Sequence, residues 1–384
     1  MAEKIVKNDW VSSFNLIGVP KINDYSFKID EKSEKSNWIY NAMNLGIDCG
    51  DAHGLIFVEL MGGFSAENEN RIFAHGKNDD GSDNFDAQVI VDWNDRFDDG
   101  ILEEIGDLSF INIGLEKTDK DKTFYKKFLS AYDAIAYIKE HLNENMVVNV
   151  KGNLKYSVYN DVVQVRKNVT SIALSKVDDP SKYKATFTQT VLLDKDSTSL
   201  RNIDKDKGVM YIDARVLDYV KEVNGVEVKG QYPYKKQFEF ALNLENEKQC
   251  KAVYEKLFKV KKDITQITME GNFVEGGAVV TATLDDLPDD IRDLVEMGVY
   301  TEEEACAKCT ANGSRERRMV FTKPMIKLVG EDKTPVVQKF EERFTEDDLI
   351  LDCMTKNKTE ENNMSFDTDE DSDADSSMDW LNSL

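Results

Sequence analysis

The chain has 384 residues, with 49 Lys and Arg against 73 Asp and Glu, and its formal net charge is −24. This length is too great for one core of common size, so we expect two domains with appendages. The acidic balance repels phosphate at long range. It therefore counts against binding of nucleic acid by bulk charge and confines any such binding to local basic faces.

No apolar run approaches the roughly 20 residues that a membrane-spanning helix needs, and the N-terminus lacks the apolar core of a signal peptide. Five scattered cysteines are typical of a reducing compartment. We therefore expect a cytoplasmic protein with no membrane partner. Cys306 and Cys309 form a CxxC pair, which is either part of a metal site or two thiols one helical turn apart; no histidine is near, and we assign no metal.

The first part of the chain predicts strands. Residues 1–36 hold apolar clusters at Trp10–Ile17 and Tyr25–Ile29, interrupted by Pro20, and we expect an N-terminal arm or hairpin here. Strand signals separated by Gly, Asn and Asp clusters follow at residues 38–45, 55–64, 71–77, 86–93 and 109–115.

A helix and two strands complete this unit. Apolar residues recur every three or four positions from Phe124 to Leu142, which predicts a helix that buries one face. Strands are predicted at 146–158 and 162–174, and Asn160-Asp161 between them suits a turn.

The second unit repeats this order of elements. Asn224-Gly225 is a strong hairpin signal, and an acidic insertion of helical pattern at 284–314 precedes the last strand. The predicted elements are strands at 186–193, 209–220 and 226–244, a helix at 245–260, and strands at 264–283 and 317–329.

Strands, then a helix, then a closing hairpin is the order of a five-stranded OB barrel. We therefore expect a mainly β protein with some α structure, built as two tandem OB-like Greek-key barrels at residues 37–178 and 179–330, with 284–314 as a helical insertion in the second. Residues 331–358 are assigned to a linker with a short helix. Residues 359–384 hold nine acids and no Lys or Arg, and we expect a disordered acidic tail.

Alternation along the strands places basic and aromatic residues together on the faces that point away from the cores. Single-stranded nucleic acid needs this pairing, because every base offers a π face and every nucleotide a phosphate. The alternative is a Lys-rich face that only keeps the protein soluble. The candidate nucleic-acid-binding residues are Arg71, Phe73, His75, Lys77, Lys151, Lys155, Tyr159, Tyr211, Arg215, Tyr219, Lys235, Lys236, Arg317, Phe321 and Lys323.

The chain ends Met378-Asp379-Trp380-Leu381-Asn382-Ser383-Leu384, an aromatic residue and two leucines after the acidic run. This ending and the duplicated barrel order resemble bacterial and phage single-stranded-DNA-binding proteins, and the large insertion looks more like a phage or mobile-element type. The resemblance implies a protein that coats single-stranded DNA in replication or recombination, in the bacterial host cytoplasm if phage-encoded. It also implies that Asp379, Trp380, Leu381 and Leu384 dock replication or recombination proteins. The alternative is a tail that only solubilises the chain.

No glycine-rich phosphate loop, HExxH or GxSxG motif is present, and three histidines give little scope for general-base catalysis. We expect no enzyme and no cofactor. The rival hypothesis is a protein-interaction or virion-assembly module whose OB-like barrels bind polypeptide; the charge balance favours this rival, and the basic–aromatic alternation favours DNA binding. Oligomeric state, binding-site size and preference for DNA or RNA stay open.

Overall fold

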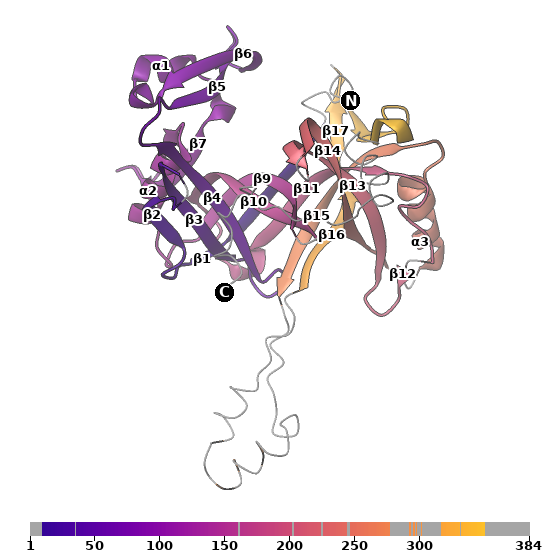
Figure 1. The fold of residues 1–384 in the computed structure, drawn as a ribbon. Coiled ribbons are helices and arrows are strands. Elements are labelled where there is room, and N and C mark those ends of the chain that lie inside the picture. The colour runs from indigo at the N-terminus through magenta and orange to yellow at the C-terminus, as the bar shows by residue number, and fades with distance from the viewer. Residues whose placement is uncertain are drawn as a thin grey trace, which may run out of the picture.

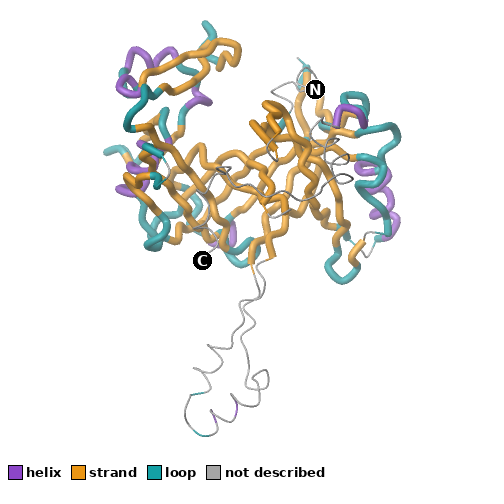
Figure 2. The backbone as a smooth tube through the Cα atoms, in the orientation of Figure 1, coloured by secondary structure: helices purple, strands orange, loops and turns teal. Residues whose placement is uncertain are grey.

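The computed structural model describes residues 10–276 except 35, 160–161, 202, 224–225 and 244–245, then residues 292, 295, 297 and 301, and residues 316–349 except 331. Strands dominate this part of the chain, as Figures 1 and 2 show. Nearly all of the predicted insertion at 284–314 and all of the predicted tail lie outside the described residues.

The first barrel is closed by five strands in OB order. Its strands are β1 (Ser12–Lys21), β3 (Trp38–Asp48), β4 (Leu55–Ser65), β9 (Val148–Tyr159) and β10 (Val162–Leu174). β1 pairs with β3, β3 with β4, β4 in parallel with β10, β10 with β9, and β9 returns to β1. The helix α2 (Ala131–His141) precedes β9 and packs on β3 and β4.

Alternate residues of these strands fill the first barrel. Leu45, Ile56 and Val150 are fully buried, and α2 adds Ile138 from its inner face. Each such side chain contributes about 1.5–3 kcal/mol to folding. The strands approach so closely at Gly152 that a Cβ atom there would lie 1.9 Å from the backbone oxygen of Asn168.

The second barrel repeats the same pairing. Its strands are β11 (Lys184–Leu193), β13 (Val209–Val223), β14 (Val226–Ala241), β15 (Thr265–Gly276) and β16 (Glu316–Pro324). β11 pairs with β13, β13 with β14, β14 in parallel with β16, β16 with β15, and β15 returns to β11. Before β15 the helix α3 (Glu247–Val253) continues into a π-helical turn (Tyr254–Phe258). The prediction of two tandem OB-like barrels is confirmed.

The two barrels share one continuous sheet. In its N-terminal half β1 lies between β9 and β11, because Ser13 is paired with Asn153 on one side and with Thr188 on the other. This arrangement joins the barrels edge to edge (Figure 1). The predicted N-terminal arm is therefore wrong for residues 12–21, since Phe14 and Leu16 are buried in the first barrel.

A compact insertion separates β4 from α2. β5 (Arg71–Lys77) and β6 (Asp83–Asp92) form a separate two-stranded sheet, followed by the short helix α1 (Asp99–Glu104), and Figure 1 shows this hairpin projecting from the first barrel. Val91, Ile105 and Phe110 form its own small core. β7 (Ile111–Lys117) and β8 (Thr123–Phe128) then extend the barrel sheet, with β7 parallel to β10.

The helix predicted from Phe124 begins later. Phe124 and Phe128 lie on the strand β8, and α2 starts after Ser130, whose hydroxyl accepts the N–H of Tyr132. The spacing of the two phenylalanines coincides with a helical period, which misled the prediction. The capping serine marks the true start.

Shorter strands complete the described chain. β2 (Phe27–Lys32) pairs with β3, and β12 (Ile203–Asp204) pairs with β13. β17 (Ile326–Val329) and β18 (Thr334–Val337) form a hairpin, and β19 (Lys339–Phe340) pairs with β15. A 3₁₀ turn spans Glu346–Leu349. Phe344 and Leu349 pack against Leu192 and Leu217, so residues 334–349 belong to the folded body and are no linker. Within the described part, no helix is long and apolar enough to cross a membrane.

Candidate nucleic-acid interface

Asp218 of β13 joins the second barrel to the end of β9 in the first. Its carboxylate accepts the ammonium group of Lys155 at 3.1 Å and the backbone N–H of Tyr156 at 2.9 Å. Tyr219 follows Asp218 in the chain, and Tyr159 lies further along β9 on the same side as Lys155. The contact thus brings Lys155 of the first barrel and Asp218 of the second to one place, which we call the junction, while Tyr219 points to the opposite face of β13 from Asp218.

Two exposed tyrosines lie on the strands that make this contact. The Tyr159 side chain is 47% exposed and that of Tyr219 is 53% exposed. Behind them a row of rings packs between the barrels: Tyr156 and Tyr234 lie 6.3 Å apart, and Tyr234 and Tyr232 lie 4.8 Å apart. Burial, and next the charge of Asp218, raises the pKa of Tyr234 to about 12. Tyr234 therefore stays neutral within the row of rings packed between the barrels, while the outer tyrosines face solvent.

Alternation on β13 and β14 places four predicted residues on one outer face. Tyr211, Arg215 and Tyr219 follow one another on β13, and Lys235 lies opposite Arg215 on β14. Arg215 donates to Asp194 at 2.5 Å, and the hydroxyl of Tyr211 donates to Asp204 at 3.2 Å. No carboxylate of the described chain lies within 4.0 Å of the Lys235 ammonium group, so Lys235 is the available cation on this face.

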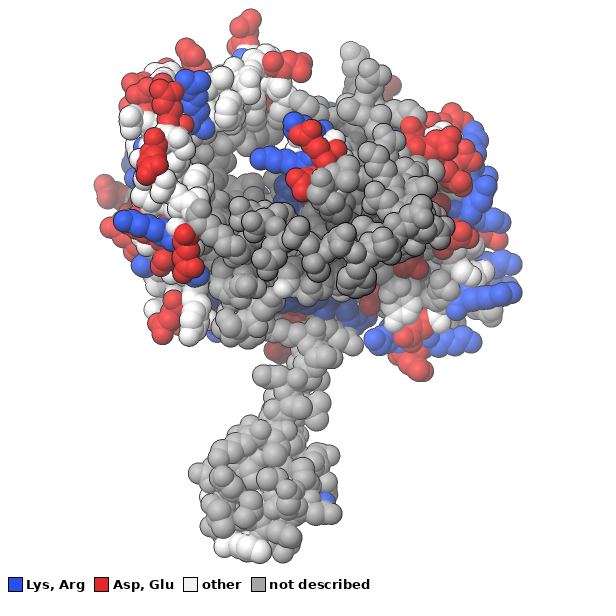
Figure 3. All heavy atoms as spheres, in the orientation of Figure 1, with Lys and Arg blue, Asp and Glu red and all other residues white. Residues whose placement is uncertain are grey.

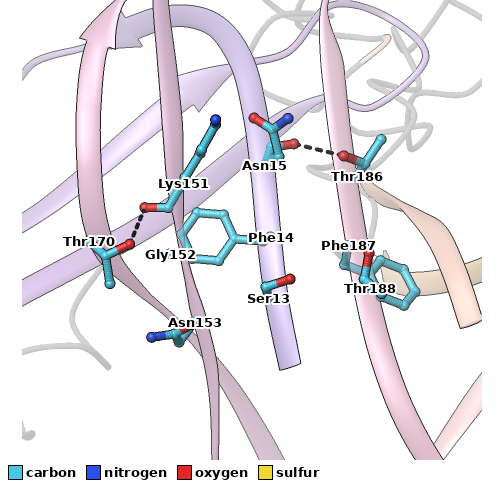
Figure 4. A pocket seen from close by; sticks show the side chains of 10 residues that line it. All are labelled: Ser13, Phe14, Asn15, Lys151, Gly152, Asn153, Thr170, Thr186, Phe187 and Thr188. Atoms are coloured by element: carbon cyan, nitrogen blue, oxygen red, sulfur yellow. Dashed lines mark hydrogen bonds between the residues drawn. The ribbon is translucent and has the colours of Figure 1, made fainter. Parts of the chain in front are cut away.

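A polar hollow lies where β10, β9, β1 and β11 run side by side (Figure 4). Its volume is about 350 Å³, and Ser13, Asn15, Asn153, Thr186 and Thr188 supply hydroxyl and amide groups along it. Figure 4 shows Lys151 and Asn15 extending side by side between Thr170 and Thr186. The side-chain oxygen of Asn15 is buried without a hydrogen-bond partner. Because Lys151 and Lys155 both point outward from β9, polar groups continue from this hollow to the junction.

Figure 3 draws the charged side chains on one face of the molecule. Red side chains gather over the β5–β6 hairpin, and blue side chains lie together with red ones at the rim of the opening between that hairpin and the second barrel. An acidic protein can approach a polyanion only where cations gather locally.

The four candidates on β5 lie apart from the junction, on the projecting hairpin (Figure 1). Arg71 pairs with Glu69 and Asp92, and Lys77 lies 3.9 Å from Asp107. The His75 ring contacts Asp83 at 2.7 Å and Ser109 at 2.9 Å, so it ties the insertion together. Phe73 is 65% exposed, and Arg71 is also exposed.

Two candidates point inward, contrary to the predicted alternation. Phe321 is fully buried, 5.4 Å from the ring of Phe187 and 4.7 Å from that of Phe238. A β-bulge causes this. Lys323 is paired with Glu270, but Phe321 is paired with the next residue, Gly271, so Thr322 is an extra residue in β16. The inward and outward alternation of side chains therefore changes at Thr322.

Lys236 lies on the inner side of β14, where it is partly buried. Burial, and next the positive charge of Lys167, lowers the pKa of Lys236. On β16, Arg317 is exposed, and Lys323 is exposed but lies 3.1 Å from Glu270. None of these three residues lies at the junction contact made by Asp218.

Sequence reasoning missed two groups of surface residues. The small polar side chains of the hollow lie partly on β1, which was assigned to an arm. Phe124 and Tyr125 of β8 are also exposed, although the pattern placed Phe124 on a buried helix face. The lysines beside them, in the run KTFYKK, were a usable signal for an exposed strand.

Several predicted features lie outside the described residues: Asp379, Trp380, Leu381 and Leu384 of the tail, and the pair Cys306 and Cys309. In the part of the chain that the structure describes, no group of three or more His, Cys, Asp or Glu side chains could hold a metal ion.

Comparisons with known proteins find a structural likeness. No family model matches the sequence, and no curated protein matches it. Among solved structures, the chain is similar to a deletion mutant of the single-stranded DNA binding protein from Thermus aquaticus. The TM-score is 0.30 and the sequence identity is 9%, over 69% of this chain and 87% of that chain. Residues of the two chains are not equated at this level of similarity.

Proposed function

We propose that this protein binds single-stranded DNA without catalysing a reaction, along the outer faces of its two joined barrels. The observation that carries the proposal is the junction: the contact of Lys155 with Asp218 joins two barrels whose outer strand faces carry exposed tyrosines and cations. Aromatic rings that stack on bases, beside cations that meet phosphates, bind a single strand with little preference for sequence.

In this proposal, Tyr159 and Tyr219 stack on bases. Lys151, Lys155 and Lys235 meet phosphates, and the hydroxyl and amide groups of the hollow suit sugar and base edges. The remaining acidic surface keeps the protein soluble and limits binding to this path.

We also propose that the protein acts in replication or recombination in the cytoplasm, as a phage or mobile-element protein. The acidic tail would recruit partner proteins through Asp379, Trp380, Leu381 and Leu384. Composition supports this role: apolar groups at the end of an anionic tether can fill a partner's pocket, and the tether competes locally for a cationic face.

A fluorescence titration tests the proposal. Intrinsic tyrosine and tryptophan emission is followed while oligo-dT is added at several salt concentrations, using the full chain and a chain ending at Lys358. We expect salt-sensitive quenching that is stronger without the tail, since counterion release scales with the phosphates neutralised.

Absence of quenching from both proteins would overturn DNA binding. Binding of polypeptide to the same surface would then support the protein-interaction module, the second hypothesis from the sequence. Quenching that does not respond to removal of the tail would overturn only the proposed competition by the tail.

A further inference from the structure

β8 is the outermost strand at one end of the large sheet. It pairs with β7, and no described residue pairs along its other side. The backbone N–H and C=O groups on the open side of such a strand are a template for another extended chain. β8 lies on the first barrel beside α2, far along the sheet from the second barrel.

Two neighbouring aromatic side chains on this strand are exposed. Phe124 is 49% exposed and Tyr125 is 54% exposed, and successive residues of a strand point to opposite faces. An incoming strand would therefore meet an aromatic ring on either side of the sheet. Covering rings of this size is favourable because it removes apolar area from water.

The same hairpin is rich in lysine. Lys117 pairs with Asp121 at 2.7 Å, and Lys127 pairs with Asp107 at 2.9 Å. Lys120, Lys122 and Lys126 have no carboxylate of the described chain within 4.0 Å, which leaves three cations available. The Lys126 ammonium group lies 4.7 Å from the Tyr137 ring, which holds its stem against α2.

The hairpin is an ordered element of the structure. The N–H of Thr118 donates to the carbonyl of Lys122 at 2.8 Å, and Asp121 takes a positive φ of 57° that closes the turn. Edge lysines by themselves are a common device against unwanted pairing. That device does not account for two adjacent exposed aromatic residues, because they favour association.

We propose that β8 is the docking edge for an extended acidic peptide of a partner protein, which pairs with it as an added strand. The backbone would supply main-chain hydrogen bonds, alternate carboxylates would meet Lys120, Lys122 and Lys126, and an apolar side chain would cover Phe124 or Tyr125. Charge complementarity selects this partner: the net charge of the protein is −24, so an acidic peptide is attracted only to local basic sites such as this edge. This inference is independent of DNA binding.

The test uses the full chain and an eight-residue peptide that alternates Glu with Val. Binding is measured by fluorescence anisotropy of the labelled peptide, and hydrogen exchange reports which backbone amides are protected. We expect saturable binding and slower exchange at residues 123–128. A peptide alternating Lys with Val should not bind, and the Glu peptide N-methylated on one edge should lose binding because it cannot donate to β8.

Charge-reversal variants locate the site. Lys120→Glu, Lys122→Glu and Lys126→Glu together should weaken binding at least tenfold. The matched control reverses Lys32, Lys139 and Lys195, which are exposed elsewhere, and should retain most of the binding. Equal loss in both triple variants, or protection away from β8, would overturn the proposal. Loss of oligo-dT affinity in the β8 variant but not in the control would reassign this edge to nucleic acid.

Discussion

Lys167 of the first barrel donates to the carboxylate of Glu275 in the second at 2.5 Å, and both side chains are only 7% exposed. The Lys167 ammonium group also lies 4.8 Å from the ring of Phe273. Beside this pair, the N–H of Glu275 donates to the carbonyl of His53 at 2.8 Å. A buried ion pair therefore fixes the angle between the barrels where the backbone of one meets the backbone of the other.

Lys167→Met should destabilise the protein by about 3–5 kcal/mol, since it leaves the Glu275 charge buried without its partner. Urea unfolding measures this change. The control is Lys117→Met, which breaks an exposed pair and should cost less than about 1 kcal/mol. Lys167→Met combined with Glu275→Leu should recover much of the loss. Equal midpoints for the two single variants would contradict the structural role of the pair.

Tyr219→Ala should weaken binding of oligo-dT by about 1–3 kcal/mol, because a stacking surface is removed. This loss corresponds to a Kd roughly 5- to 150-fold higher. Tyr25→Ala is the matched control, since Tyr25 is similarly exposed but lies before β2, away from the junction. The two affinities are compared by fluorescence titration, and an unchanged affinity for Tyr219→Ala would remove this residue from the interface.

Lys235→Met should reduce the salt dependence of binding. If the ammonium group meets one phosphate, the slope of log K against log salt should fall by about 0.7 for a single strand. Lys139→Met on α2 removes an equally exposed cation away from the junction and should leave the slope unchanged. Titrations at four salt concentrations give both slopes, and parallel lines for the wild type and Lys235→Met would place Lys235 outside the phosphate path.

Gly152→Ala should unfold or strongly destabilise the first barrel, because the new methyl group would overlap the Asn168 carbonyl and the Phe14 ring. Overpacking of this kind costs about 1–3 kcal/mol or more. Gly230→Ala is the control, because its nearest neighbours are at ordinary contact distance. Thermal unfolding should separate the two variants clearly; a Gly152→Ala protein as stable as Gly230→Ala would show that these strands can move apart.

The insertion should loosen in acid. Burial raises the pKa of Asp83, but the Leu108 N–H and the His75 ring outweigh burial and hold the pKa below its usual 3.8. A depressed pKa stabilises the fold above 3.8, and this contribution is lost as the pH falls through the lower, folded value. The protection factors of the β5 and β6 amides, which correct hydrogen exchange for its intrinsic pH dependence, should therefore fall below pH 3.8. Asp83→Asn should remove this pH dependence, while Asp79→Asn on the same hairpin should keep it.

The order of elements was predictable from the sequence, but for some strands the sequence did not predict which residues point into the core. Alternation on β13 correctly placed Met210, Ile212 and Ala214 in the core, because that ladder is regular there. On β16 the bulge at Thr322 places Phe321 inward. No sequence pattern indicates where a strand will hold such an extra residue.

Contacts between distant segments explain the remaining differences between the predicted and the observed structure. The junction depends on the ion pair between Asp218 and Lys155. A single sequence does not indicate which acidic residue will pair with which basic residue. Likewise, β1 looked like an arm because its partners β9 and β11 lie more than a hundred residues away. Candidate residues could be grouped by strand, but their grouping in space required the fold.

The position of β1 between β9 and β11 has a consequence for how the protein is made. All five strands of the first barrel are present in the chain once β10 has been synthesised, and the edge of β1 that pairs with β11 is then still uncovered. β11 begins ten positions after β10 ends, so the segment that covers this edge emerges almost at once. We therefore expect little time for another nascent chain to pair at this edge, and we expect the first barrel to serve as the template on which β11 and the second barrel form.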